Sequence, residues 1–283
     1  MNSLIADPDL DLLDSADVDD LIVLIDHITD KGECRISLSS DTCKTLTDAK
    51  AARSIPPGTR ALIAEELRRF GGNSFINLLR GGAGVPYKEI VCDVASHLKT
   101  DFRPAQSCGE IEIAAVNAVL AQSFSKMSEQ EKADLFAEFG GTYAPGAGPA
   151  VMAALQAAIK ASGFGAFKLA AVVANAVAKA ILGRGLAFGA TAGLMRGISV
   201  FAGPIGWAIT AIWTAFDLGS PAYRVTVPCV IQIAYMRQKA AYRSCPTCKA
   251  PAEAGKKFCG ECGSPLALLL TQTDAGGTAD ASH

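Results

Sequence analysis

Residues 60–98, RALIAEELRRFGGNSFINLLRGGAGVPYKEIVCDVASHL, decide the fold class because apolar residues with helical spacing recur there between stop signals. Gly71 is a typical helix stop, and the stripe before it consists of Leu62, Ile63, Leu67 and Phe70. Asn73 is expected to cap a second short helix. Pro86 is expected to open a third helix, which runs to about Leu98. The segment therefore predicts a bundle of short helices.

Upstream, residues 7–30 predict an amphipathic helix with an acidic start that suits the helix dipole. Ser15 is the expected N-cap, and the helix is expected to end before Gly32. Its apolar face consists of Val18, Leu21, Ile22, Ile25 and Ile28. Residues 33–54 are polar and show no clear period, so we expect a loop with some helix there.

Downstream, two further helices are predicted over about 110–125 and about 129–139. Ser128 and Glu131 have the spacing of a capping box at the start of the second of these helices. The N-terminal half is therefore expected to be entirely helical.

A last helix is expected within residues 222–242, where Pro228 is the probable start. These patterns divide the chain into four parts. They are an N-terminal helical domain (residues 1–145), a hydrophobic helical region (146–242), a metal-binding ribbon (243–266) and a disordered tail (267–283).

The composition supports an all-α fold. Half of the 283 residues are hydrophobic, 19% are charged and 7% are aromatic, and 27 are glycine. An apolar excess made of small aliphatic residues is typical of closely packed helices rather than of a β-sandwich. The formal net charge of −2 gives no electrostatic argument for nucleic-acid binding by the whole molecule.

The hydrophobic region contains an unusual glycine repeat. Residues 146–218 carry few charges, and four glycines recur there at every fourth position, at Gly185, Gly189, Gly193 and Gly197. On a helix this spacing places them on one face, where they permit close contact with another helix. The uncharged run 197–216 that follows is just long enough to cross a bilayer, although Gly203 and Pro204 interrupt it.

Two interpretations of this region stay open. One is a glycine-packed hairpin that dips into a membrane or docks on it, with lipid contact through residues 146–218. The other is a hairpin buried between helices of a soluble protein, where the same glycines permit close packing in water. Lys168 and Lys179 would have to extend toward the membrane surface if residues 165–183 formed a second crossing.

Four of the nine cysteines form a cluster with the spacing of a metal site. Cys245, Cys248, Cys259 and Cys262 follow the pattern C-x2-C-x10-C-x2-C. Two such pairs complete the tetrahedral shell of Zn²⁺, and Gly260 and Gly263 are expected to let the second pair turn around the ion. The alternatives are two disulfides or an iron–sulfur site, of which the second lacks the ferredoxin spacing. We predict a closed structural zinc ribbon with these four ligands and no catalytic position.

The remaining cysteines and the N-terminus indicate the compartment. Five cysteines are scattered singly, at Cys34, Cys43, Cys92, Cys108 and Cys229. Residues 1–30 contain nine aspartates and no lysine or arginine, which is unlike the start of a signal peptide. We therefore expect a cytoplasmic protein with unpaired thiols, in one interpretation associated with the inner membrane.

Weaker patterns favour structural roles. Gly183, Gly185 and Gly189 resemble a dinucleotide loop, but they follow an alanine-rich helix rather than a strand. His27 and His97 are expected to be core or surface histidines rather than a catalytic pair. The run from Arg224 to Lys257 carries seven basic residues and one acidic residue, which suits an anionic lipid, RNA, an acidic partner or a solvated face.

Three blocks resemble the bacterial YaaW family of uncharacterised proteins. They are LIAEELRRFGGNSFINLLRG at 62–81, YKEIVCDVASHLK at 87–99 and GSPAYRVTVPCVIQIAYMRQK at 219–239. The resemblance spans most of residues 7–240 and implies a distant likeness to the helical domain of ubiquinol–cytochrome c chaperones. It therefore implies a helical fold and a chaperone-like or membrane-proximal role. The cysteine cluster is a departure from the family pattern.

The resemblance carries over no catalytic residue. The positions that fall on its motifs are Phe70, Gly71, Gly72, Arg80, Tyr223 and Arg224. Arg80 and Arg224 could bind an anion or an internal carboxylate such as Asp93, and helix capping or ion pairing is the simpler alternative.

Two hypotheses about function follow. The first is a non-enzymatic helical protein, membrane-proximal or chaperone-like or active in stress or defence, whose zinc ribbon recruits a protein partner. The second is a fully soluble enzyme or nucleic-acid-binding regulator in which the glycine-rich helices form a buried core. The second is less favoured because the common hydrolase, nucleotide-loop and zincin motifs are absent from the sequence and the ribbon carries Phe258 as its one aromatic residue.

Overall fold

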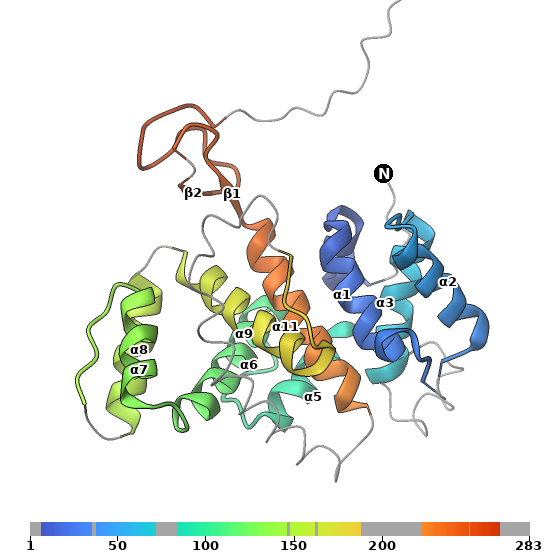
Figure 1. Cartoon of the computed structure of the whole chain (residues 1–283), viewed down its shortest axis with the longest axis horizontal. Coiled ribbons are helices and arrows are strands. Elements are labelled where there is room, and N and C mark those ends of the chain that lie inside the picture. Colours follow the sequence, from blue (N-terminus) through green and yellow to red (C-terminus); the bar gives the residue numbers. More distant parts are fainter. Residues whose placement is uncertain are drawn as a thin grey trace, which may run out of the picture.

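The computed structural model describes residues 7–35, 38–71, 84–145, 148–161, 164–187, 222–248 and 250–266. The described part of the chain is helical except for one short hairpin and irregular connections, as the composition predicts (Figure 1). The N-terminal part contains the 3-10 helices η1 (Pro8–Ser15) and η2 (Asp30–Gly32) and the α-helices α1 (Val18–Thr29), α2 (Ser40–Ala51), α3 (Pro57–Gly71), α5 (Tyr87–His97), α6 (Cys108–Phe124) and α7 (Glu129–Glu138). The C-terminal part contains α8 (Pro149–Ala161), α9 (Gly165–Leu182), α11 (Tyr223–Ala240), β1 (Tyr242–Ser244) and β2 (Pro251–Glu253).

Helix α11 lies at the centre of the bundle. It packs most extensively on α9 and also contacts α1, α3, α5 and α6, and it crosses the middle of the molecule in Figure 1. Every residue from Val225 to Met236 is buried. One hydrophobic core therefore runs from Leu10 in η1 to Met236 in α11. The boundary drawn at residue 145 from the sequence separates helices that share this core.

Several helix ends follow from local sequence signals. The side chain of Ser128 accepts a hydrogen bond from the backbone N–H of Glu131, whose carboxylate accepts from the Ser128 N–H, so the predicted capping box is present. A second box, made by Ser107 and Glu110, starts α6. Gly71 is the last residue of α3, close to its predicted end.

Other local expectations are wrong. Ser15 does not cap α1, because it belongs to η1, whose own cap is Asp7, and Asp17 takes the N-cap position of α1. Pro228 lies inside α11 instead of starting it. The helix continues through the proline because the residues on both sides are buried against other helices, which compensates for the missing backbone donor.

Residues 33–54, which show no clear hydrophobic period in the sequence, contain α2. This helix buries only Cys43 and Leu46. Two buried positions on a polar helix produce a weak periodic signal. Cys43 forms a disulfide with Cys34, so these two cysteines are not the unpaired thiols that we expected. The disulfide joins α2 to the segment that follows η2.

Of the four glycines in the repeat, Gly185 is the one that lies among the described residues. Gly185 lies in the irregular segment after α9, so it does not belong to a helical face. A Cβ atom at Gly185 would lie 2.6 Å from the side-chain oxygen of Asn175, which accepts a hydrogen bond from the Leu186 N–H at 3.0 Å. The close approach of the Asn175 side chain, rather than of another helix, accounts for a glycine at position 185. The other three positions and the run 197–216 lie outside the described residues.

A buried ion pair joins α11 to α6. The Glu112 side chain is buried and accepts hydrogen bonds from Arg237 Nε at 2.9 Å and Nη2 at 3.1 Å. The hydroxyl of Tyr87 donates to the same carboxylate at 2.9 Å, and Arg237 Nη2 donates to the backbone oxygen of Asp9 at 2.7 Å. Burial raises the pKa of Glu112, and the hydrogen bonds from Arg237 oppose this rise. The Glu112 carboxylate therefore accepts three hydrogen bonds, and α11, α6, α5 and η1 meet around it.

We expect Arg237→Met to lower the free energy of unfolding by about 3–5 kcal/mol, because it leaves the Glu112 carboxylate buried without its cation. Urea denaturation followed by circular dichroism measures the change. The matched control is Arg53→Met, which breaks the exposed pair with Asp19 and should cost no more than about 1 kcal/mol. Equal losses in the two variants would contradict a special role of the buried pair.

His27 in α1 is a buried histidine, as the sequence suggested. Its side chain is buried, and Nδ1 has no hydrogen-bond partner. Burial lowers the pKa of His27 to about 3, the Asp26 carboxylate opposes this, and the positive charges of Arg35 and Arg184 add to it. The folded protein therefore keeps His27 neutral at pH values where the unfolded chain binds a proton.

Because the unfolded chain protonates His27 below about pH 6.5, stability should fall as the pH decreases from there toward 3. The loss should approach about 1.4 kcal/mol per pH unit once the unfolded histidine is charged. Urea denaturation at pH 7, 6 and 5 should show this slope in the wild type, and His27→Leu should remove it. An unchanged slope in the variant would assign the pH dependence to other groups.

Candidate metal centre

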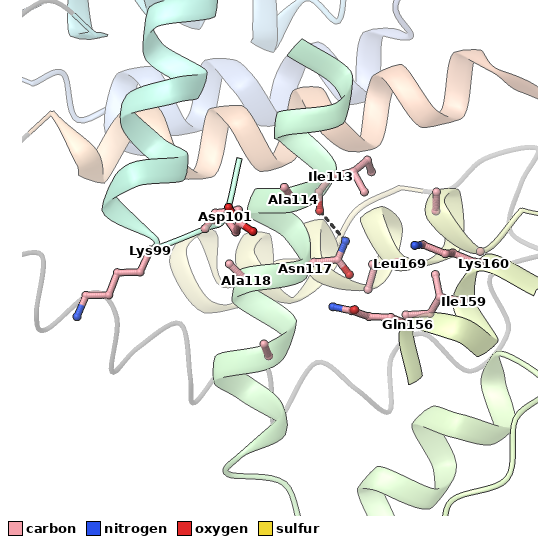
Figure 2. A pocket seen from close by; sticks show the side chains of 14 residues that line it. Lys99, Asp101, Ile113, Ala114, Asn117, Ala118, Gln156, Ile159, Lys160 and Leu169 are labelled. Atoms are coloured by element: carbon pink, nitrogen blue, oxygen red, sulfur yellow. Dashed lines mark hydrogen bonds between the residues drawn. The ribbon is translucent and has the colours of Figure 1, made fainter. Parts of the chain in front are cut away.

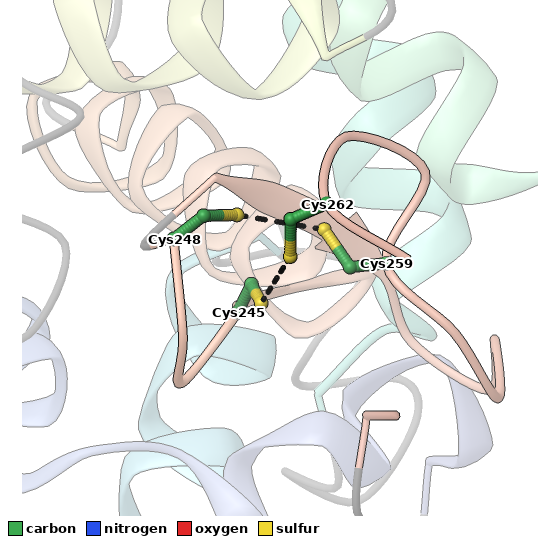
Figure 3. A group of neighbouring side chains, drawn as sticks. All are labelled: Cys245, Cys248, Cys259 and Cys262. Atoms are coloured by element: carbon green, nitrogen blue, oxygen red, sulfur yellow. Dashed lines mark hydrogen bonds between the residues drawn. The ribbon is translucent and has the colours of Figure 1, made fainter. Parts of the chain in front are cut away.

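The four clustered cysteines lie in two turns that follow the last helix. Cys245 comes directly after β1, and its N–H donates to the backbone oxygen of Ala250 at 2.8 Å, which closes the first turn. In the second turn the Gly263 N–H donates to the backbone oxygen of Cys259 at 3.0 Å. Strand β1 pairs antiparallel with β2, with Tyr242 opposite Glu253, and Figure 3 shows the four side chains converging beside this hairpin.

The sulfur atoms have the separations of a tetrahedral thiolate site. All four Sγ atoms lie within 4.8 Å of one another, with Cys245 at 3.7 Å from Cys262 and Cys248 at 3.6 Å from Cys259. A tetrahedron with metal–sulfur bonds of about 2.3 Å has sulfur–sulfur edges of about 3.8 Å. A disulfide requires about 2.05 Å, so no pair in the cluster is a disulfide. The arrangement can therefore hold one metal ion.

Residues of the metal centre also form part of a small hydrophobic core within the ribbon. Cys245 and Cys259 are buried with Ala252 and Leu266, apart from the main core. Gly263 has a φ of +69°, the left-handed conformation that favours glycine in the second turn, as expected. Gly260 lacks a positive φ, and Gly255, with a φ of +93°, takes the turn between β2 and the second cysteine pair. With four buried residues, this module depends on its centre for stability.

Hydrogen bonds lower the pKa values of two of the thiols. Hydrogen bonds from the side chain and backbone of Ser264 lower the pKa of Cys262 to about 6. Backbone hydrogen bonds from Cys248 and Thr247 lower the pKa of Cys245. Thiolates are the form that binds a metal, and N–H groups that point at sulfur stabilise them.

Aromatic contacts join the ribbon to the helical body. The ring of Tyr242 in β1 lies 6.0 Å from the Phe167 ring in α9 and 6.5 Å from the Phe164 ring. The Ala254 N–H donates to the backbone oxygen of Ala241 at 2.7 Å. In Figure 1 the hairpin follows the end of α11 and lies outside the helical bundle.

The basic run from Arg224 to Lys257 is not one free face. Arg237 pairs with buried Glu112, and Lys239 pairs with Asp17 at 2.6 Å and with Asp20 at 2.7 Å. Within the ribbon, Lys256 pairs with Glu253 at 3.0 Å. Much of the local positive charge is therefore matched by carboxylates.

Of the predicted anion-binding or ion-pair group, which consists of Arg80, Arg224 and Asp93, the structure describes Arg224 and Asp93. Arg80 lies outside the described residues, and Arg224 is the second residue of α11, after Tyr223. The Tyr223 ring stacks on His97 at 3.9 Å, and Asp93 lies close enough to raise the Tyr223 pKa after the larger effect of burial. The structure shows no ion pair between Asp93 and Arg224, so the group stays a prediction.

A cavity that the sequence did not indicate lies between α6, α8 and α9, beside the segment that follows α5. Its volume is about 610 Å³, which is in the range of small-ligand sites. Figure 2 shows Asn117, Gln156 and Lys160 at its wall, and Thr100 Oγ1 is buried there without a hydrogen-bond partner. The lining comes from four separate segments, so no local motif marks it. It contains neither histidine nor cysteine.

Of the described helices, α9 is long and apolar enough to cross a membrane by length and composition alone. Its most apolar window is 67% buried inside the protein, a property that the core helix of a soluble protein shares. Among the described residues, the four clustered cysteines are the one group of three or more potential ligands that could hold a metal.

The fold and the site define a helical protein with a small C-terminal cysteine module. A family model described as "Ubiquinol-cytochrome C chaperone" matches residues 58–231, and no solved structure matches the chain. A UPF0174 protein of Helicobacter pylori strain J99 is 41% identical over 178 residues, which cover 62% of this chain and 70% of the relative. The UPF0174 protein YaaW of Escherichia coli K12 is 32% identical over 185 residues, with the same two coverages.

The chain therefore belongs to the UPF0174 family, and it also matches the ubiquinol–cytochrome C chaperone family model, as the resemblance indicated. The match to the family model ends at residue 231, before Cys245, the first cysteine of the metal centre.

We expect the purified full chain to contain one zinc ion, because the four sulfur atoms form one closed shell. Elemental analysis of protein prepared under reducing conditions without chelator measures zinc and iron together. Cys259→Ser should lose the metal and the structure of the ribbon, while the helical circular dichroism stays nearly unchanged. Stoichiometric iron would contradict zinc, and a metal content near zero would contradict the centre.

Proposed function

We propose that this chain is a non-enzymatic, chaperone-like helical protein whose C-terminal zinc ribbon recruits a protein partner. The observation that carries the proposal is the family match over residues 58–231, because that family is described as a chaperone family. These residues extend from α3 into α11 and include most of the helical core. The chaperone-like activity belongs to this helical body, and the ribbon adds a separate binding element.

Zinc is the ion that we propose for the cysteine centre. Four thiolates in two C-x2-C turns are the usual donor set of structural zinc sites, and Zn²⁺ itself has no redox chemistry. The sulfur separations of 3.6 and 3.7 Å agree with this assignment. When bound, the ion would neutralise neighbouring thiolates and hold the two turns together.

The surface of the ribbon supports recruitment of a protein. Phe258 is 62% exposed and is the exposed large hydrophobic residue of the described structure. Lys256 and Lys257 precede it and are also exposed. One exposed aromatic residue among charged neighbours suits a small protein interface better than a single-stranded nucleic acid, which usually stacks on several aromatic rings.

The proposal of membrane contact is based on the sequence of the hydrophobic region and not on the described helices. Burial of α9 in the protein favours the alternative in which the hydrophobic region is a soluble core. The uncharged run 197–216 still has the length and composition of a membrane segment. We propose peripheral association with the inner membrane from the cytoplasmic side, through residues 146–218.

The proposal is tested by crosslinking and purification from cells at native expression, with the wild type and Cys259→Ser side by side. We expect a protein that copurifies with the wild type and is lost with the variant, because the variant keeps the helical body but not the ribbon. Fractionation of the same cells and liposome flotation test the membrane part. Identical partners for both proteins would contradict recruitment by the ribbon, and protein found wholly in the soluble fraction without lipid binding would contradict membrane association.

A further inference from the structure

The four cysteines of the centre differ in their exposure to solvent. Cys245 is 0% exposed and Cys259 is 3% exposed, whereas Cys248 and Cys262 are exposed residues. Each C-x2-C turn therefore contributes one buried and one exposed cysteine. A small oxidant in solution therefore meets Cys248 and Cys262 more readily than Cys245 and Cys259.

Each exposed sulfur atom also contacts a buried one from the other turn. The exposed Cys262 sulfur lies 3.7 Å from Cys245, and the exposed Cys248 sulfur lies 3.6 Å from Cys259, as Figure 3 shows with dashed lines. A disulfide bond of about 2.05 Å requires each pair to approach by less than about 2 Å. Rotation of exposed side chains can supply such a movement without unfolding the helical body.

We propose that this centre is a site of oxidative modification, in which hydrogen peroxide converts it to two disulfides, Cys245–Cys262 and Cys248–Cys259, and the metal is released. The inference rests on the zinc-ribbon assignment of the proposed function. Thiolate sulfur that solvent can reach is the form of cysteine that peroxide oxidises, and a neighbouring thiol resolves the product.

The chemistry balances for each pair. The exposed thiolate attacks one peroxide oxygen, the O–O bond breaks, and the sulfur becomes a sulfenic acid while hydroxide leaves and is protonated to water. The buried thiolate then attacks the sulfenic sulfur, the S–O bond breaks, and a second water forms. Two thiolates lose two electrons, and one peroxide gains them. Two peroxides therefore oxidise all four cysteines, after which the sulfur atoms no longer hold the ion.

The cysteines of the helical body provide an internal comparison. Cys108 and Cys229 are buried, and Cys92 is partly buried in α5. None of these three belongs to the cluster of potential metal ligands in the described structure. They should react more slowly than the centre, because peroxide cannot reach the buried ones and none has a second thiol in contact.

The experiment uses the full chain, with its metal content measured first. Hydrogen peroxide is added in steps, released zinc is followed with a colorimetric chelator, and samples are alkylated and digested for disulfide mapping by mass spectrometry. We expect complete zinc release at about two peroxides per zinc, the two disulfides across the turns, and intact Cys92, Cys108 and Cys229. Cys92→Ser is the control variant, and it should release zinc at the same rate as the wild type.

The outcomes separate this inference from the proposed function. A chain that binds no zinc would contradict the proposed function, while the disulfide map of that same chain would still test the modification. Zinc that is retained until the body cysteines are oxidised would overturn the modification. Disulfides within the turns, Cys245–Cys248 and Cys259–Cys262, would overturn the pairing that the structure assigns.

Discussion

The ion pair between Arg237 and Glu112 is the constraint on which the rest of the structure depends. It joins the central helix α11 to α6, and through Tyr87 and the backbone of Asp9 it also fixes α5 and η1. A buried carboxylate is tolerated when every hydrogen-bond position around it is used, so the four segments must meet in one arrangement. This arrangement places the end of α11, and with it the start of the ribbon, at the edge of the bundle.

The acidic N-terminal segment extends the same principle. Asp20 is buried beside Lys239, and Asp26 is buried between Lys50 and Arg184, which lie in α2 and just after α9. These carboxylates therefore hold together elements from both ends of the chain. Two of the acidic residues near the N-terminus are therefore paired with basic residues from later in the chain.

Features set by neighbouring residues could be predicted from the sequence, and features set by distant residues could not. The capping box of Ser128 and Glu131 and the two C-x2-C turns each involve residues a few positions apart. Pro228 was misread because burial on all sides of α11 outweighs the local preference of proline. Gly185 was misread because its neighbour is Asn175, a side chain ten residues away, rather than the next glycine in the repeat. The cavity beside Asn117 had no local signal at all.

The helical body and the ribbon are stabilised by different physical means, and this difference bears on function. The body rests on one continuous apolar core from Leu10 to Met236, so a change in one of its helices affects the others. The ribbon has its own core of four buried residues, two of which are cysteines of the candidate metal centre, and Tyr242 packs on Phe167 of the body. We therefore expect loss of a bound metal ion to unfold the ribbon while the body stays folded. The four-residue core of the ribbon shares no residue with the apolar core of the body, so the order of one does not depend on the packing of the other.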